Sequence, residues 1–357
     1  MSITLEELQL AARNHGLPLE ALRHPITPIG LHYLLIHFDI PFVDADSWRL
    51  DVGGRVERPL TLSLDDLKRR PARTLAVTLE CAGNGRALLA PPRAASQPWL
   101  LEAVGTAEWT GTPLAPILEE AGVLADAVEV VFAGLDRGVQ GEVEHAYERS
   151  LPLDEALRDE LLLAYAVNGE PLPPQHGFPL RLVVPGWYGM THVKWLRSIE
   201  VVSEPFRGWQ QETAYRIAGI PVTRMLPRSL MVPPGIPDFP SRLRFVEPGP
   251  CELEGRAWSG HGRVERVEVS ADGGESWEDA ALGEPLSEFA WLGWSYEWHA
   301  EPGDHELCCR ATDATGNTQP VESPWNLDGY CNNAVQRVPV TVRAMPSPAA
   351  RSYSIGL

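Results

Sequence analysis

The stretch at residues 73–86, RTLAVTLECAGNGR, decides the fold of the chain around it. Apolar side chains alternate with smaller or polar ones over residues 75–79, which predicts a strand with one buried face. Glycines at 83 and 85 follow Cys81 at once, so the strand ends in a turn that carries a thiol. Soft metals prefer thiolate donors, and glycines let a bulky ligand approach the backbone. The stretch predicts either a metal site at Cys81 or a buried structural cysteine beside a turn.

The length and charge of the chain limit its class. Its 357 residues exceed the usual size of one hydrophobic core, and 44% of them are hydrophobic, so we expect two domains. A formal net charge of −18 disfavours nucleic acid and anionic membrane surfaces, because like charges repel over the whole approach. Small molecules or basic proteins are better partners.

The cysteines and the N-terminus bear on the compartment. Five cysteines without a CxxC pair indicate neither a disulfide framework nor a structural zinc site, and reduced thiols suit the cytoplasm. The chain begins with a predicted helix, where Thr4 and Glu7 have capping-box spacing. It shows no signal-peptide pattern, and no apolar run reaches the ~20 residues of a membrane span. We expect a cytoplasmic protein with no membrane anchor, unless an export signal preceded residue 1.

Several motifs carry a resemblance to a known family. The segment VTLECAGNGR at 77–86 resembles the molybdenum-binding loop of the sulfite oxidase family, which usually reads CAGNRR. In that family the cysteine thiolate ligates molybdenum, and Cys81 is the matching residue. NGEPLP at 168–173, HGFPLR at 176–181 and HVKW at 192–195 are similar to family motifs and follow in the same order. The resemblance covers roughly residues 31–345.

The resemblance implies a cofactor, a single molybdopterin that holds molybdenum through Cys81. The positions that match its cofactor-binding residues are His37, Asp136, His176, Arg181, His192, Val193 and Lys194. A pterin with a phosphate needs such donors, since arginine gives planar bidentate contacts and lysine a point charge. Taken alone, these residues could also be a solvated basic rim, a turn aspartate and core histidines. Lys194 is one of only two lysines in the chain, which argues against scattered surface charge.

The resemblance also implies catalytic residues. Tyr215, within FRGWQQETAYRIAG at 206–219, matches the family's active-site tyrosine, with one more residue between it and Trp209 than in the relatives. Arg86 and Arg263 match other arginines near the active site.

Two positions depart from the sulfite-oxidising pattern. Leu35 stands where an arginine precedes the histidine of an RNH tripeptide, and Asp328 stands where another arginine follows WNL. The first change removes a positive charge and the second reverses one, so an anion should bind less tightly. We expect sulfite, the default substrate of the family, to be a poor substrate, and a neutral or less charged oxo donor or acceptor to be preferred.

The composition changes after a proline-rich linker, MVPPGIPDFP at 231–240. Short alternating runs separated by turn signals such as DGG at 272–274 predict a β-sandwich. This region resembles the family's immunoglobulin-like dimerisation domain, which implies a homodimer. The expected class is α+β, with an N-terminal helix and linker (1–30), a mixed α/β molybdopterin-binding domain (31–230), an all-β immunoglobulin-like sandwich (236–345) and a C-terminal tail (346–357).

The implied activity is a two-electron oxo transfer between molybdenum and a small-molecule oxo donor or acceptor. The electrons would pass to or from an external carrier that the sequence does not name. Two other classes stay open: a cysteine hydrolase with Cys81 as nucleophile and His176 or His37 as base, and a non-catalytic dimeric binding protein that kept the fold. Metal analysis and an absorbance spectrum of the purified protein would separate the three.

Overall fold

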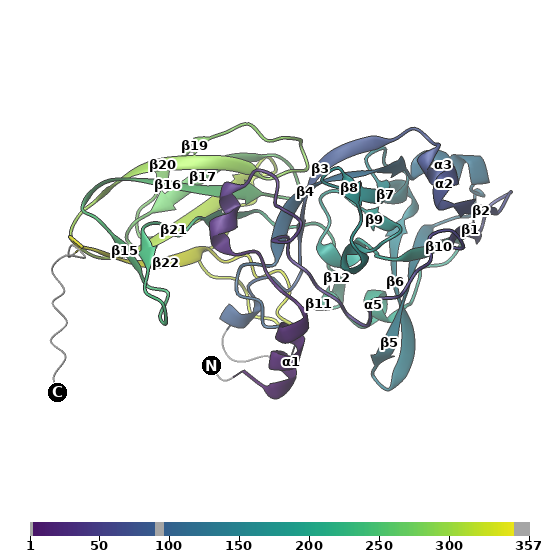
Figure 1. Ribbon diagram of the computed structural model, residues 1–357, viewed down its shortest axis with the longest axis horizontal. Helices are drawn as coiled ribbons and strands as arrows, with labels where there is room; N and C mark the ends of the chain where they lie inside the picture. Colours follow the sequence, from purple (N-terminus) through teal and green to yellow (C-terminus); the bar gives the residue numbers. More distant parts are fainter. Residues whose placement is uncertain (1–2, 90–95, 346–357) are drawn as a thin grey trace.

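The computed structural model describes residues 3–89 and 96–345, which form two parts side by side (Figure 1). Strands β1 to β12 belong to the first part and β13 to β22 to the second. This arrangement confirms the expected class, a mixed domain followed by an all-β sandwich. The domain limits stay a prediction, and the expected tail at 346–357 lies outside the described residues.

Two sheets form most of the first part. The first has the order β2-β1-β10-β5-β6, with strands Leu60–Ser63, Arg49–Gly54, Leu196–Val202, Glu129–Gln140 and Val143–Pro152. The second has the order β3-β4-β7-β8 with β9 also on β7, and its strands are Arg73–Glu80, Val104–Pro113, Leu162–Val167, Glu170–Pro171 and Arg181–Val183. Strands β1 and β10 run parallel, while their neighbours pair antiparallel.

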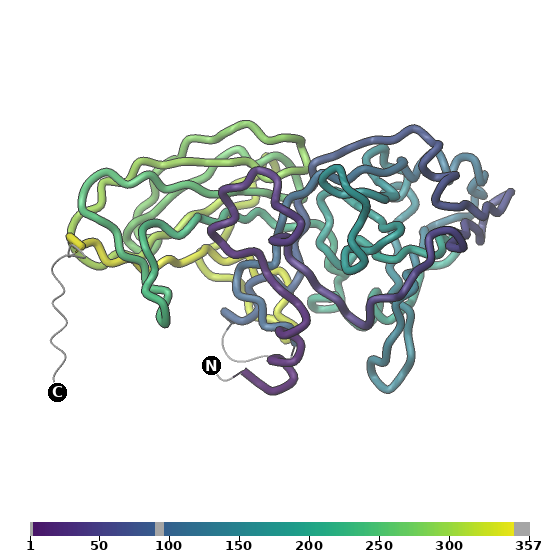
Figure 2. Tube along the Cα trace, viewed as in Figure 1, coloured from purple at the N-terminus to yellow at the C-terminus, as the bar shows by residue number. Residues whose placement is uncertain are grey.

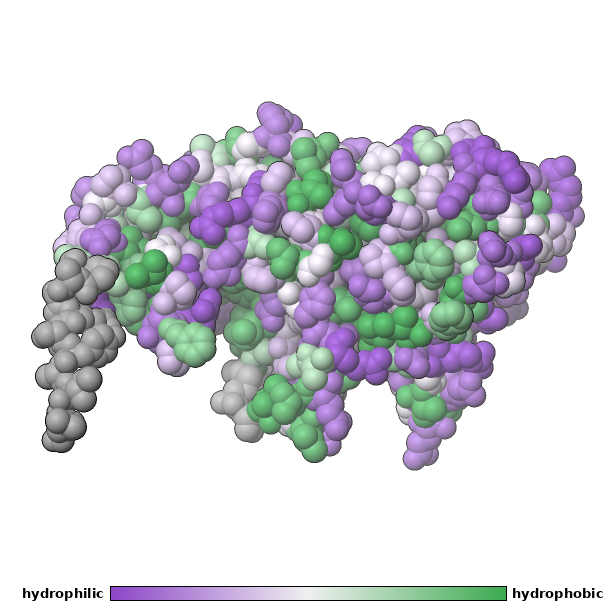
Figure 3. All heavy atoms as spheres, viewed as in Figure 1, coloured by the Kyte–Doolittle hydropathy of each residue, from purple (hydrophilic) through white to green (hydrophobic). Residues whose placement is uncertain are grey.

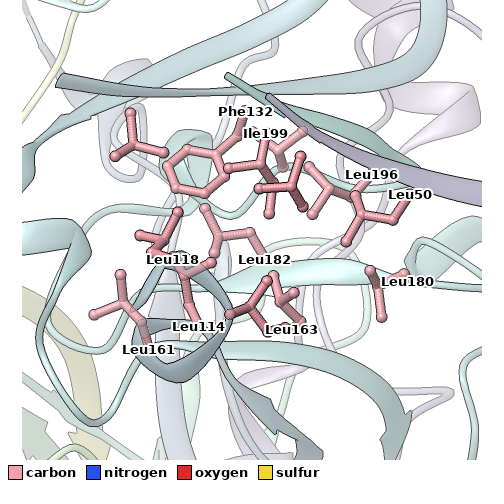
Figure 4. Close-up of a cluster of buried hydrophobic side chains, with 14 of the residues drawn as sticks. Leu50, Leu114, Leu118, Phe132, Leu161, Leu163, Leu180, Leu182, Leu196 and Ile199 are labelled. Atoms are coloured by element: carbon pink, nitrogen blue, oxygen red, sulfur yellow. The ribbon is translucent and has the colours of Figure 1, made fainter. Parts of the chain in front are cut away.

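The core of the first part lies between these sheets (Figure 4). Phe132 and Ile199 point in from the first sheet, and Leu163 and Leu182 from the second. Leu118 of helix α3 (Ala115–Ala121) packs between them. Each of these side chains is at most 1% exposed, and burying one such side chain contributes about 1.5–3 kcal/mol. The two sheets are therefore held at a fixed spacing, which positions the loops at their ends.

The helices are short, and the first of them is capped as the sequence predicts. Helix α1 (Leu5–Arg13) has the expected capping box: the Thr4 side chain accepts from the Glu7 N–H, and the Glu7 carboxylate accepts from the Thr4 N–H. The other α-helices are α2 (Leu64–Lys68), α4 (Leu153–Ala156) and α5 (Trp209–Glu212), and the 3-10 helices are η1 (Leu19–Arg23), η2 (Arg86–Leu88), η3 (Pro174–His176) and η4 (Gly189–Thr191). A small hairpin of β11 (Arg216–Ile217) and β12 (Ile220–Pro221) follows α5.

The second part is a sandwich of two sheets. One has the order β13-β16-β20-β19, with strands Arg228–Met231, Gly249–Trp258, Leu292–Ala300 and Ala281–Leu282. The other has the order β14-β15-β22-β21-β17-β18, with strands Ile236–Pro237, Arg244–Val246, Gln336–Val342, Gly303–Asp313, Val264–Ser270 and Glu278–Asp279. Leu253 and Trp294 from the first sheet meet Val267, Leu307 and Val340 from the second in one buried core.

The two parts share a buried junction next to the cysteine loop. Ala82 belongs to the same hydrophobic cluster as Trp258 of β16 and Tyr330 of the second part. Glu80, the last residue of β3, forms an ion pair of 2.7 Å with Arg228 of β13, and both side chains are at most 1% exposed. The Glu80 carboxylate also accepts from Trp258 Nε1 at 2.8 Å. The second part thus fixes the residue just before Cys81.

The N-terminal segment lies at the boundary between the two parts. Figure 2 shows this segment, in purple, running along the boundary between the two parts. Leu5 and Leu8 of α1 are more than half exposed, and Figure 3 shows hydrophobic atoms at the lower edge of the molecule, where Figure 1 places α1. Among the described residues, no helix has the length and apolar character needed to cross a membrane.

Candidate active site

A pocket opens in the first part, where the ends of several strands meet the segment before β1. It contains about 640 Å³ of empty space, mouth included. Eight of the residues predicted for the site line it: His37, Cys81, Asp136, His176, Arg181, His192, Lys194 and Tyr215. Residues separated by up to 178 positions in the sequence therefore share one cavity.

Cys81 is held at the pocket by the end of β3. Its N–H donates to the Ala103 carbonyl at 2.9 Å, which extends the β3–β4 ladder by one residue. The chain then turns at Gly85, whose φ of 87° lies in the left-handed region that glycine tolerates best. Burial raises the pKa of the Cys81 thiol, while the positive charge of Arg86 and the Gly83 N–H favour the thiolate. A metal cation at the sulfur would add to these two effects.

Two cations line the pocket without a carboxylate partner among the described residues. Arg181, the first residue of β9, donates to the carbonyls of His176 at 3.2 Å and His192 at 3.3 Å. Lys194 Nζ donates to the carbonyls of Leu35 at 2.8 Å and Gln175 at 3.0 Å. Burial lowers the pKa of Arg181 to about 10 and that of Lys194 to about 7. Both groups would gain from a nearby anion, which would offset the cost of burying their charge.

Three buried histidines supply neutral donors and acceptors. Burial lowers the pKa of His32 to about 4, that of His176 to about 2 and that of His192 to about 3, so all three are uncharged at neutral pH. His192 Nδ1 accepts from the Val184 N–H at 3.1 Å. Its Nε2 must therefore carry the proton, which it donates to the Trp187 carbonyl at 3.0 Å.

Asp136 adds a carboxyl group to the wall. It sits in an irregular stretch of β5, where the register with β6 shifts between Ala133 and Arg137. Burial raises the pKa of Asp136 to about 6, and Lys194 partly opposes the shift. This carboxyl group can therefore hold or release a proton close to neutral pH.

The donor set fits a pterin that carries a phosphate and a metal. Three polar atoms around the pocket, His32 Nε2, Asp136 Oδ1 and Arg181 Nε, are buried without a hydrogen-bond partner among the described residues. Buried polar atoms normally have partners, and a ligand in this pocket could supply the missing ones. The ring of a pterin offers complementary donors and acceptors, its phosphate suits Arg181 and Lys194, and a soft metal suits the Cys81 thiolate.

A histidine and a tyrosine close the pocket near Cys81. His37 Nε2 and the Tyr215 hydroxyl lie 2.5 Å apart, and the His37 ring lies 4.7 Å from the Tyr147 ring. The Tyr215 ring stacks on Tyr330 with 5.0 Å between centroids. Tyr215 has a φ of 56°, an uncommon backbone conformation for a bulky residue, so this position is held by its surroundings.

Three other predicted residues do not line the pocket. Arg86 is buried beside the cysteine loop, where Nε donates to the Asp328 carbonyl and Nη1 to Ser96 Oγ, both at 2.7 Å. Val193 is fully buried in the main core, and its carbonyl accepts from the Leu182 N–H. Arg263 is exposed just before β17, so the structure does not bring it to this site. The functional assignments of all three stay predictions.

The two departures from the sulfite-oxidising pattern lie in different surroundings. Leu35 lines the pocket, where its carbonyl accepts from Lys194. The Asp328 side chain is exposed, and only its carbonyl is directed toward Arg86. The loss of a cation at Leu35 therefore affects the pocket directly, whereas the reversed charge at Asp328 is screened by solvent.

Sequence reasoning missed residues of β6 that reach the same wall. Tyr147 lines the pocket and donates to the Met190 carbonyl at 2.7 Å. Arg149 lies two residues later on the same strand and is fully buried. Tyr147 and Arg149 lie two residues apart, which places both side chains on one face of the strand. This spacing is the signal that the sequence offers for them. The adjacent charged residues Glu148 and Arg149 are typical of a solvent-exposed strand, so the spacing is easily overlooked.

Comparison with known proteins identifies the family. The model of the oxidoreductase molybdopterin binding domain matches residues 37–210, and that of the Mo-co oxidoreductase dimerisation domain matches 239–343. The sulfite oxidase of Gallus gallus is 37% identical over 342 residues, which cover 87% of this chain and 72% of the relative. The chain belongs to the sulfite oxidase family. Its cofactor is therefore molybdenum bound by molybdopterin, and the matched first domain is the one that binds it.

Other members of the sulfite oxidase family are similar over most of this chain. The mitochondrial sulfite oxidase of Rattus norvegicus is 38% identical over 341 residues, 89% of this chain. The chain spans only 62% of the length of that relative. The crystal structure of the sulfane dehydrogenase SoxCD from Paracoccus pantotrophus superposes with a TM-score of 0.79 at 29% identity, over 92% of this chain and 86% of that one.

The hydrolase alternative finds no support in the geometry. A cysteine nucleophile needs a base within hydrogen-bonding reach, and no hydrogen bond joins Cys81 to His37 or His176 in the described part of the chain. Burial also lowers the pKa of both imidazoles, to about 3 and about 2, which makes them weak bases.

Proposed function

We propose that this protein catalyses a two-electron oxo transfer between molybdenum and a small oxo donor or acceptor. The observation that carries the proposal is the position of Cys81, which lies in one pocket with the buried cations Arg181 and Lys194 inside a matched molybdopterin-binding domain. When bound, the cofactor supplies a two-electron redox centre that exchanges an oxygen atom with the substrate. The protein supplies binding, orientation and proton positions.

Each group of residues has a role that follows from its position. The Cys81 thiolate would ligate the metal. Arg181 and Lys194 would bind the phosphate, and the neutral histidines and Asp136 would bind the pterin. Because a hydrogen bond joins His37 and Tyr215 next to Cys81, this pair can hold a proton at the substrate end of the pocket. An external carrier would exchange the electrons.

The substrate part of the proposal rests on Leu35. An arginine at this position would face the pocket, and at about 5 Å with an effective dielectric of about 20 its charge is worth ~3 kcal/mol on a monoanion. If solvent screens two thirds of that, the loss is still roughly fivefold in affinity. We therefore propose that sulfite is a weaker substrate here than in the sulfite-oxidising relatives, and that less charged oxo donors or acceptors compete well with it.

Steady-state kinetics on molybdenum-loaded protein test both statements, with ferricyanide as the artificial acceptor. Leu35→Arg should raise kcat/KM for sulfite between fivefold and a hundredfold, and Asp328→Arg should change it little because that side chain is exposed. The double variant should resemble Leu35→Arg. Efficient sulfite turnover by the wild type that Leu35→Arg leaves unchanged would refute the substrate proposal. A loaded protein that transfers oxygen to or from no sulfur or nitrogen oxo compound would refute the reaction itself.

We also propose that the protein is a homodimer in the cytoplasm. The matched dimerisation domain at 239–343 supports the dimer, whose interface should be twofold and self-complementary. Light scattering at micromolar concentration should give about twice the chain mass of 39.3 kDa, and a value at the chain mass would contradict the dimer. Reduced cysteines support the compartment, although several relatives are named as mitochondrial; cell fractionation would test it.

A further inference from the structure

Arg149 is a buried cation with almost no partners. It lies on β6 with 0% of its surface exposed, and its Nη1 donates to the Gln210 carbonyl. Its Nε and Nη2 are buried without a hydrogen-bond partner among the described residues. Burial lowers the pKa of Arg149, yet an arginine side chain stays protonated in proteins. A full positive charge therefore sits inside the first part with two free donors.

Other buried arginines near the cysteine loop have a counter-charge or more acceptors than Arg149. Arg228 pairs with the Glu80 carboxylate at 2.7 Å, although its Nη1 has no hydrogen-bond partner among the described residues. Arg86 donates to three oxygens, those of the Asp328 carbonyl, the Ser96 hydroxyl and the Gln97 carbonyl. Arg149 has no ion pair within the described ranges 3–89 and 96–345. A buried charge without a partner is costly, and its presence is explained most simply by an anion that arrives during function.

The charge of Arg149 lies behind one wall of the pocket. Its guanidinium carbon is 5.8 Å from the centre of the Tyr215 ring. Tyr147, two residues earlier on the same face of β6, lines the pocket, as do Tyr215 and His37. The charge of Glu129 raises the pKa of Arg149 slightly against the effect of burial, and the Glu129 carboxylate itself accepts from the Phe206 N–H at 3.1 Å. The field of Arg149 therefore acts on the tyrosine wall through a region of low dielectric, where it is weakly screened.

We propose that Arg149 is a specificity-determining residue, whose unpaired charge draws an oxyanion of the sulfite or sulfate class to the Tyr147–Tyr215 wall of the pocket. This inference rests on the proposed function for the class of substrate. It adds that the pocket, which lacks a cation at Leu35, keeps one that is supplied from β6. The protein should then bind anions less tightly than a pocket with both an arginine at position 35 and Arg149. It should bind them more tightly than a pocket with neither.

Calorimetric binding of inorganic sulfate to the molybdenum-loaded protein tests the proposal without turnover. The cofactor must be bound, because Arg181 and Lys194 then bind the cofactor and not the added sulfate. Arg149→Met removes the charge and keeps much of the packing, and Arg149→Gln removes the charge and keeps a donor for the Gln210 carbonyl. Each should weaken sulfate binding about tenfold, whereas Arg149→Lys should stay within about threefold of the wild type. Arg137→Met is the matched control, because Arg137 is exposed on neighbouring β5 and pairs with Glu144.

Kinetics separate a charge effect from a structural one. Arg149→Gln should raise KM for sulfite about tenfold, a larger change than in KM for a neutral sulfoxide, and adding Leu35→Arg should restore sulfite affinity. A folded Arg149→Gln or Arg149→Met protein that binds sulfate like the wild type overturns the proposal. If neither neutral variant folds, Arg149→Lys is the test. A tenfold loss of sulfate affinity in this variant would show that the geometry of the arginine matters and not its charge, which would overturn the proposal. Sulfate binding that depends on Arg149 in a protein without turnover would refute the proposed function and leave this inference standing.

Discussion

His37 Nε2 lies 2.5 Å from the Tyr215 hydroxyl, although 178 residues separate the two in the chain. Burial raises the pKa of Tyr215 well above its usual value and lowers that of His37 to about 3. Both groups are therefore uncharged at neutral pH, and the imidazole tautomer sets which of the two donates. The bond links the extended segment before β1 to the loop after α5 and places a hydrogen-bonded proton at the pocket that holds Cys81.

Replacing the thiol at the end of β3 should remove the metal and leave the fold. Serine is a harder and less acidic donor than cysteine, so Cys81→Ser should lose molybdenum and activity, while its thermal unfolding stays close to that of the wild type. Elemental analysis and circular dichroism measure the two effects. Cys251→Ser is the control, since Cys251 lies in the second part. Full turnover with molybdenum bound in Cys81→Ser would show that another residue ligates the metal.

Removing either pocket cation should weaken retention of the pterin. Arg181→Ala and Lys194→Ala each delete charge-assisted contacts worth ~1.5–3 kcal/mol, which corresponds to roughly ten- to a hundredfold in affinity. Pterin content after dialysis, read from its fluorescence on release, measures the loss. Lys68→Ala is a matched control, because the only other lysine of the chain is exposed on α2. Equal pterin content in all three variants would mean that the phosphate binds elsewhere.

Local signals in the sequence predicted the parts of the fold that depend on neighbours along the chain. The capping box at Thr4 formed as its spacing indicated, and the alternation before Cys81 became β3. These features depend on backbone hydrogen bonds and side chains within a few residues. Family motifs predicted eight residues that now line one pocket, because each motif lies where a strand or turn ends.

Tertiary surroundings decided what local patterns could not. Leu35 and Asp328 both stand where sulfite-oxidising relatives have an arginine, yet only the first lines the pocket. No sequence motif marks Arg149, and only the cover of α5 and the packing of Tyr215 make it a buried charge. Arg263 matched a motif but is exposed. Burial of a charge depends on segments distant in sequence, so periodicity alone does not reveal it.

Mild acid should destabilise the protein through the pocket histidines. His32, His37, His176 and His192 have folded pKa values of about 4 or lower, below the unfolded value of about 6.5, so the unfolded state binds more protons below pH 6.5. The pKa of Asp136 is raised to about 6 in the folded state, so this group binds a proton more readily when the protein is folded. It therefore acts in the opposite direction between about pH 4 and 6.

Four histidines less one aspartate leave about three more protons on the unfolded state than on the folded state. The free energy of unfolding should therefore fall by at most about 4 kcal/mol per pH unit near pH 5. Urea unfolding measured at pH 7, 6 and 5 checks this. The contribution of the histidines is fully present above pH 6.5 and is lost as the pH falls. A free energy of unfolding that stays constant from pH 7 to pH 5 would contradict the buried, neutral histidines.

Deleting one hydroxyl should separate proton handling from cofactor binding. Tyr215→Phe removes the bond to His37 but keeps the ring stacked on Tyr330 and its contact with Arg149. Proton transfer by a positioned side chain typically contributes about 10²–10⁴-fold, so kcat should fall at least tenfold while molybdenum and pterin content stay unchanged. Tyr296→Phe, in β20 of the second part, serves as the control and should match the wild type. Because the pair acts as donor and acceptor, His37→Gln should lower kcat similarly, and the double variant should be no worse than either single change. Additive losses in the double variant, or an unchanged kcat in Tyr215→Phe, would show that the two residues do not act as one unit in turnover.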